Sequence, residues 1–141
     1  MGNTKVTLRV SVGLGALQAF IGLGALGGGF LLVKDPSGSA MGLPLSLLDR
    51  SLFPDYLIPG IFLFAVNGIG SMIGAGLSFT RRRRAPETAM TLGAILVAWI
   101  VIQVIIIASI SWLHIMYFIL GFIELGMGLY LRHRRLPDNS L

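Results

Sequence analysis

The carboxyl group of Glu124 is the first candidate for chemistry in this sequence. It is the only charged residue in an apolar run from residue 118 to residue 131. An acid in such a run either binds a proton or cation in a transport path or forms a hydrogen bond that ties its helix to a neighbour. The sequence supplies no second acid, basic partner or chain of relays for transport. We therefore favour the hydrogen-bonded role, and a third alternative is that Glu124 extends toward Arg132.

Three further strongly polar side chains lie in apolar stretches: Gln18, Asn67 and Gln103. An amide group without a partner in an apolar medium loses its hydrogen bonds to water, which is costly. By helical rise, Gln18 and Asn67 fall near the middle of a membrane, Gln103 in its outer half and Glu124 in its inner half. We expect these four groups to turn inward as a buried polar cluster. In it, Glu124 would bond to Gln18 or Asn67, of the same chain or of another copy.

A second group of candidates is expected at the outer side of the membrane: Trp99, Trp112, His114 and Tyr117. Aromatic residues are enriched at membrane interfaces, so an ordinary interfacial belt is the first interpretation. The alternative is a lipid or quinone site that also uses Gln103. His114 has no second metal ligand three or four positions away, so we predict no metal site.

The sequence offers little for catalysis. It contains no cysteine, which excludes disulfides, thiolate metal sites and thiol chemistry. Residues 22–27 satisfy the GxGxxG pattern of dinucleotide-binding proteins, but that pattern binds pyrophosphate only between a strand and a helix, and here it lies within an apolar stretch. There are no paired acids and no Ser-His-acid set. We predict no enzyme activity and no cofactor.

The elements that must position these residues are membrane-spanning helices. The chain is 55% hydrophobic and 12% charged, with a mean hydropathy of +0.84, which is typical of bilayer-embedded proteins. A span needs about 20 apolar residues. As one helix, the stretch 88–131 would be roughly 66 Å long, twice the membrane thickness, so it must fold back, and we expect the turn at 109–111. The prediction is a single all-α domain, 1–141, with four helices at about 8–33, 57–80, 88–109 and 112–131.

Small residues share faces with the polar groups on three of these helices. Nineteen glycines occur in the chain, and small side chains allow membrane helices to approach closely. We expect these faces to pack helices together and to support a homo-oligomer. The members are Ser11, Gly15, Gly22 and Gly29 with Gln18; Gly70, Gly74 and Ser78 with Asn67; and Tyr117, Gly121 and Gly128 with Glu124.

The distribution of basic residues predicts the orientation. Of the eleven, Lys34 and Arg50 lie in the loop between the first two helices, and the other nine lie at the termini or between the second and third helices. By the positive-inside rule, both termini face the cytoplasm. The first apolar stretch exceeds the roughly 7 to 15 residues of a signal-peptide core, so we expect a retained helix.

Four consecutive arginines occupy the loop between the second and third helices: Arg81, Arg82, Arg83 and Arg84. We expect them to contact anionic lipid head groups on the cytoplasmic face, each contact being worth about 1 kcal/mol. No interleaved aromatic residues or folded basic domain accompany them. Nucleic-acid binding is therefore not predicted.

The loop between the first two helices is too apolar to extend freely into water. Pro44 can begin a short helix whose leucines, Leu43, Leu47 and Leu48, lie on the membrane surface. Asp49 and Arg50 would then face outward. We therefore expect a short amphipathic segment in the outer loop.

The order DPSG, GLPLSLL and FPDYLIPG in this loop, followed by a glycine-rich helix with Asn67, resembles a family of small uncharacterised bacterial four-helix inner-membrane proteins. The later stretch WIVIQVIIIASISWLHIMYFILGFIELGMG does so too, so the likeness covers nearly the whole chain. The family has Gln-Pro where this chain has His114 and Ile115, which weakens any shared role of His114. The resemblance implies architecture and location in the bacterial inner membrane, and no activity.

Three functions are open at this stage. The first is a non-enzymatic accessory or self-assembling membrane subunit, with an unidentified membrane protein as a further partner. The second is a small channel or transporter in which Glu124 and Asn67 surround a path. The third is a lipid or quinone binding protein that uses Trp99, Gln103 and their aromatic neighbours. We favour the first from the sequence.

Overall fold

The computed structural model describes residues 2–49, 51–107 and 112–139, and all regular elements in these ranges are helical. The long helices are α1 (Gly2–Lys34), α4 (Ala85–Ile107) and α5 (Trp112–Asn139). Between α1 and α4, three segments follow one another without a break: α2 (Leu57–Phe62), the π-helix η3 (Leu63–Ile69) and α3 (Gly70–Phe79). The loop before α2 contains two short 3₁₀ helices, η1 (Ser39–Met41) and η2 (Leu45–Leu48).

Four helical stretches are long and apolar enough to cross a membrane: Lys5–Lys34, Leu57–Phe79, Ala85–Ile106 and Trp112–Arg134. The prediction of an all-helical chain with four such helices is confirmed. The helices extend further than predicted at several ends, because α1 begins at Gly2 and α5 continues to Asn139. The predicted turn at 109–111 lies outside the described residues.

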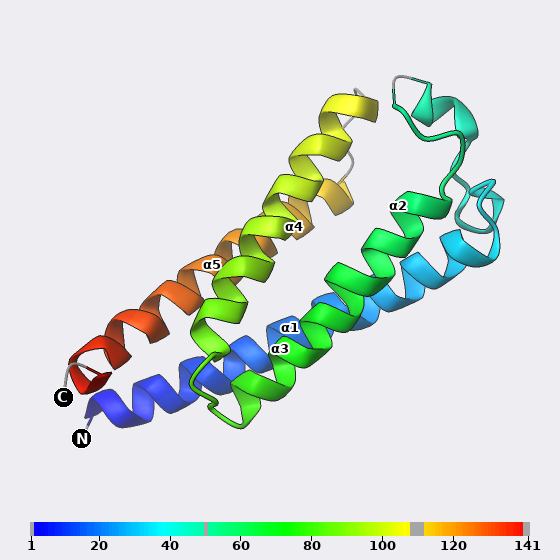
Figure 1. Cartoon of the computed structure of the whole chain (residues 1–141). Helices are drawn as coiled ribbons and strands as arrows, with labels where there is room; N and C mark the ends of the chain where they lie inside the picture. The colour runs from blue at the N-terminus through cyan, green and yellow to red at the C-terminus, as the bar shows by residue number, and fades with distance from the viewer. Residues whose placement is uncertain (1, 50, 108–111, 140–141) are drawn as a thin grey trace.

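The helices pack as two pairs. Figure 1 shows α1 lying along α2, η3 and α3, and α4 lying along α5. The two termini and the connection between α3 and α4 lie at one end, here called the terminal end. Residues 35–49 and 51–56 lie at the other, here called the loop end. The pairs contact each other through α1 with α5 and α3 with α4, and their ribbons diverge toward the loop end.

Glycines bring the backbones of each pair together. A methyl group at Gly29 of α1 would lie 2.6 Å from the backbone nitrogen of Phe64 in η3. In the other pair, a methyl group at Gly93 of α4 would lie 2.8 Å from the carbonyl oxygen of Gly121 in α5. No side chain fits at either position without a shift of backbone, so the glycine faces expected from the sequence pack helices within one chain.

The connection at the terminal end is a tight C-terminal cap on α3. The amide of Arg82 donates to the carbonyl of Leu77 at 2.9 Å, and that of Arg81 donates to the carbonyl of Ser78 at 3.2 Å. This is the bond pattern of a Schellman motif, in which Arg81 takes the left-handed conformation with φ of 54°. The motif reverses the chain within a few residues and starts α4 at Ala85, with Pro86 in its first turn.

Candidate functional site

A buried polar network joins α1, α3 and α5. Gln18 of α1 donates from Nε2 to Oε2 of Glu124 in α5, over 3.2 Å. Ser78 of α3 donates from Oγ to Oε1 of Gln18 at 2.7 Å. The hydroxyl of Ser11, two turns before Gln18 on α1, donates to the backbone carbonyl of Ser78 at 2.6 Å. All four side chains are buried, so the network replaces contacts with water by contacts between α1, α3 and α5.

The Gln18 side chain occupies space that is open because residue 74 of α3 is a glycine. A methyl group at Gly74, one turn before Ser78, would lie 2.8 Å from Nε2 of Gln18. The small residue in α3 therefore makes room for the amide between α3 and α5. One atom of the network, Oε1 of Glu124, is buried without a hydrogen-bond partner among the described residues.

The four predicted members of a polar cluster fall into two groups. Gln18 and Glu124 meet, within one chain, together with Ser11 and Ser78. Asn67 and Gln103 are elsewhere, since both line a cavity at the loop end, and Gln103 is only half-buried. The single cluster of four is therefore not what the structure contains. Helical rise placed Gln18 and Asn67 at similar depths, but it did not decide which way each side chain faces.

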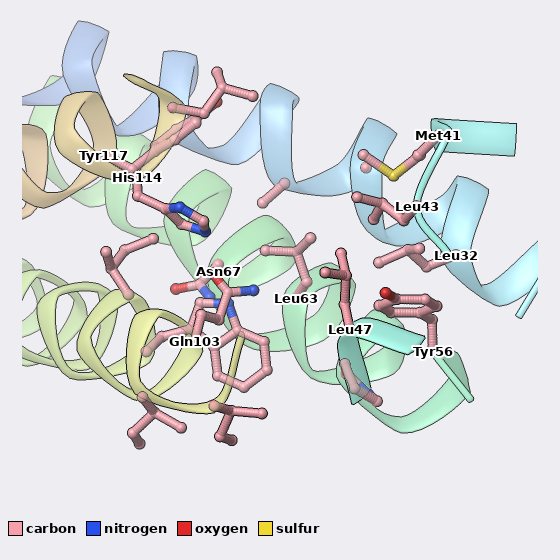
Figure 2. Close-up of a pocket in the computed structure, with 18 of the residues that line it drawn as sticks. Leu32, Met41, Leu43, Leu47, Tyr56, Leu63, Asn67, Gln103, His114 and Tyr117 are labelled. Carbon is pink, nitrogen blue, oxygen red and sulfur yellow. The ribbon is translucent and has the colours of Figure 1, made fainter. Parts of the chain in front are cut away.

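The cavity has a volume of about 470 Å³. Residues of α1, η3, α4, α5 and the loop before α2 line it. Figure 2 shows Asn67, Gln103, His114 and Tyr117 toward one end and Leu32, Met41, Leu43, Leu47 and Tyr56 toward the other. The cavity is thus amphiphilic along its length, with polar side chains at one end and mostly apolar walls at the other.

Asn67 is the most enclosed of the polar lining groups. It has 2% of its surface exposed, and its Nδ2 has no hydrogen-bond partner among the described residues. It lies in the π-helix, a wide and uncommon helical form that occurs frequently at functional sites. The next residue, Gly68, lies against α1, where a methyl group would be 2.8 Å from Cδ2 of Leu26. Close packing on α1 thus fixes this segment while the Asn67 amide faces the cavity (Figure 2).

Of the four aromatic and histidine candidates predicted from the sequence, three line the cavity and one does not. Trp99, His114 and Tyr117 line the cavity, whereas Trp112 has 69% of its surface exposed and is not part of the lining. The ring of Trp99 stacks on Phe62 of α2, with centroids 4.4 Å apart and planes 21° apart. This stack holds the indole at the edge of the cavity.

Leucines of the loop before α2, which the sequence analysis expected on the membrane surface, form part of the cavity wall. Leu48 is buried in a cluster with Leu32 and Tyr56, and Leu43 packs against it. Leu43, Leu47 and Leu48 all line the cavity. The expected short helix exists as η2, with Pro44 at its N-terminal boundary, and η2 packs on α4. Asp49 is exposed as expected, and Arg50 lies outside the described residues.

Hydrogen bonds hold this loop in place. The hydroxyl of Tyr56 donates to the carbonyl of Pro44 at 2.8 Å, and its amide donates to the carbonyl of Pro36 at 2.9 Å. Burial raises the pKa of the Tyr56 phenol above its ordinary value. The first turn of the loop closes around Asp35, whose carboxylate accepts from the hydroxyl of Ser37 at 2.6 Å and from the amide of Ala40 at 3.2 Å. The Ser37 hydroxyl is the main cause that lowers the pKa of Asp35.

The arginine cluster lies apart from the cavity but follows the polar network directly, because the Arg81 amide donates to the Ser78 carbonyl that also accepts from Ser11. Arg81, Arg82, Arg83 and Arg84 are all exposed and lie at the terminal end, between α3 and α4. Within the described ranges, no three or more His, Cys, Asp or Glu side chains gather where they could hold a metal ion. The chain matches no protein-family model, no curated protein and no solved structure.

Proposed function

We propose that this chain is a small multi-pass membrane protein that binds an amphiphilic molecule in its loop-end cavity. The observation that carries the proposal is the cavity of about 470 Å³, with mostly apolar walls and with Nδ2 of Asn67 at its polar end, which has no hydrogen-bond partner among the described residues. Sites for small ligands have volumes of about 300–1,000 Å³ and combine mostly apolar walls with a few oriented polar groups. The volume and the division of the lining into two parts both suit an amphiphile.

Residence in a membrane is supported by the outer surface of the helices. Large apolar side chains lie exposed along them, among them Leu23 with 62% and Ile105 with 68% of their surface accessible. Exposed apolar surface on this scale is unfavourable in water and ordinary in lipid. The resemblance to bacterial inner-membrane proteins and the nine basic residues at the terminal end favour an inner-membrane location with both termini in the cytoplasm. In that orientation the cavity lies in the outer half of the bilayer.

The two other functions considered from the sequence have less support. The glycine faces that suggested self-assembly pack helices within the chain, so they no longer require another copy. A transport path around Glu124 and Asn67 would need the two groups to share a space, but Glu124 bonds to Gln18 and is not part of the cavity lining. Because the cavity groups suit binding and include no set of catalytic residues, we propose a binding function without catalysis.

The test uses two neighbouring glycines of α1. A methyl group at Gly28 would be 3.5 Å from Cδ2 of Leu63, an ordinary contact, and Gly28 lines the cavity. Gly28→Leu should therefore fill part of the cavity without forcing the helices apart. Gly27→Leu is the matched control, because a methyl group there meets nothing within 4 Å.

The protein is purified from membranes in mild detergent, and native mass spectrometry followed by lipid extraction measures the amphiphile that it retains. We expect a retained amphiphile with the unaltered protein and with Gly27→Leu, and its loss with Gly28→Leu. Absence of any retained amphiphile in the unaltered protein, or equal retention by the two variants, would contradict the proposal.

A further inference from the structure

The charge of the cavity restricts the ligand that it can take. The residues that line it in the described part of the chain include no Asp, Glu, Lys or Arg. A phosphate or carboxylate head placed there would lose its hydration and would meet no lysine or arginine, which is unfavourable. The polar end therefore suits an uncharged head.

The unpartnered amide restricts the head further. Nδ2 of Asn67 can only donate hydrogen bonds, and it is buried without a partner in the described part of the chain. A buried donor is satisfied when a ligand presents an acceptor, such as a carbonyl oxygen. Gln103 and His114 line the same cavity, and Figure 2 shows them toward the same end as Asn67. These groups come from η3, α4 and α5, so they surround a head from three helices.

The remaining walls fit the tail of the same ligand. Leu32, Leu43 and Leu63 continue the cavity away from Asn67, and none of them offers a side-chain hydrogen bond. The Trp99 ring, which stacks on Phe62, also lines the cavity and offers an aromatic surface to the ligand.

We infer that the ligand is a neutral lipid with a carbonyl-bearing head, the chemical class that includes isoprenoid quinones and neutral glycerides, and that Asn67 donates a hydrogen bond to that carbonyl. The inference rests on the proposed function and deepens it. It makes Asn67 a ligand-binding residue and disfavours ionised fatty acids and phospholipids as the bound species.

The binding assay uses Trp99 as the reporter. The chain has two tryptophans, and the exposed Trp112 lies outside the cavity lining, so Trp112→Phe leaves Trp99 as the only indole. Delipidated Trp112→Phe protein in detergent is titrated with three probes. They are a benzoquinone with a decyl tail, which quenches indole fluorescence, a diacylglycerol with brominated acyl chains, and a brominated fatty acid held at a pH where it is ionised.

We expect saturable quenching by at least one of the two neutral probes, and the comparison between them identifies the source of the carbonyl head. The ionised fatty acid should quench weakly and without saturation. If the fatty acid binds as tightly as the neutral probes, the inference of a neutral head is wrong and the proposed function stands. If none of the probes quenches saturably and the unaltered protein also retains no amphiphile, the proposed function fails as well.

Asn67→Leu tests the role of the amide. Leucine is close in size to asparagine but cannot donate, so affinity for the neutral probe should fall about tenfold or more, as for loss of one buried hydrogen bond. Ser71→Ala is the control, because Ser71 is also buried, lies one turn further along and is outside the cavity lining. Unchanged affinity in Asn67→Leu would overturn the assignment.

Thermal unfolding of the delipidated protein separates binding from folding. Because the Asn67 donor is unpartnered, its replacement by leucine should not lower the unfolding temperature of the ligand-free protein. It should reduce the stabilisation that the neutral probe gives. A large loss of stability without ligand would show that the amide has a structural partner, and the inference would be wrong.

Discussion

The side chains of Gln18 in α1 and Glu124 in α5, 106 positions apart in the chain, are joined by a hydrogen bond of 3.2 Å. Gln18 uses both ends of its amide, because its oxygen accepts from Ser78 while its nitrogen donates to Glu124. The acid in the apolar run of α5 is therefore a partner in a contact between α1, α3 and α5. This arrangement indicates a structural role for Glu124, so its replacement by a residue without an acceptor should lower the free energy of unfolding.

Replacement of Glu124 should distinguish hydrogen bonding from charge. Glu124→Gln keeps an oxygen that can accept from Gln18, so we expect a change in the free energy of unfolding of no more than about 1 kcal/mol. Glu124→Leu leaves the buried Gln18 nitrogen without an acceptor and should cost about 1–3 kcal/mol. Reversible unfolding in mixed micelles measures both values.

Glu87 provides the control for that experiment, because it is an exposed glutamate in the first turn of α4. Glu87→Gln should change stability by less than about 1 kcal/mol, as for a surface charge near a helix N-terminus. If Glu124→Leu is as stable as Glu124→Gln, the hydrogen bond to Gln18 contributes nothing and the structural role is refuted.

Two glycines of α3 should respond oppositely to the same substitution. A methyl group at Gly74 would lie 2.8 Å from Nε2 of Gln18 and 2.9 Å from Cδ1 of Leu92, so Gly74→Ala should destabilise the protein by about 1–3 kcal/mol. At Gly76 a methyl group meets nothing within 4 Å, and Gly76→Ala should be neutral or stabilising by up to about 1 kcal/mol. The same unfolding titration compares the two. Equal effects would mean that α3 does not pack on Gln18 as described.

The four helices were predictable because each depends on a long local run of apolar residues, which the sequence displays directly. The hydrogen-bond partner of Glu124 could not be predicted from a local run of residues. Gln18 and Asn67 fall at similar depths by helical rise, and the choice between them depends on the rotation of η3 and on the space left by Gly74. These are properties of packing between distant segments. The glycine spacing indicated close helix contacts but could not say whether they lie within one chain.

The cavity shows a second limit of the sequence. The apolar loop indicated that Leu43, Leu47 and Leu48 must be covered, but a membrane surface and a protein cavity satisfy that requirement equally well. Tyr56 decides between them, since its hydrogen bond to Pro44 holds the loop over the helices. The π-helix around Asn67 had no signal in the sequence beyond the neighbouring glycines, Gly68 and Gly70, because a widened helix depends on contacts with α1.

Tyr56→Phe should loosen the loop wall of the cavity. The substitution removes one hydroxyl and leaves the carbonyl of Pro44 without that donor, which should cost about 0.5–1.5 kcal/mol. Because the bond joins the loop to the start of α2, the loss should be local, and hydrogen exchange at residues 43–48 should accelerate more than exchange in α4. Tyr130→Phe, at the far end of α5, is the control. Unchanged exchange in the loop would show that the hydroxyl does not hold it.

The turn around Asp35 should open in acid. Because the Ser37 hydroxyl and the amides of Ser37 and Ala40 favour the carboxylate, the pKa of Asp35 is lowered from its ordinary value of 3.8. A carboxyl group with a depressed pKa stabilises the folded turn above its unfolded pKa, and this stabilisation is lost as the pH falls below 3.8 and through the lower folded value. The protection factor of the Ala40 amide, corrected for intrinsic exchange, should therefore be constant near neutral pH and fall below about pH 4. Asp35→Asn should reduce the protection at neutral pH and remove its dependence on pH, whereas an acid transition that persists in this variant would assign the effect to another group.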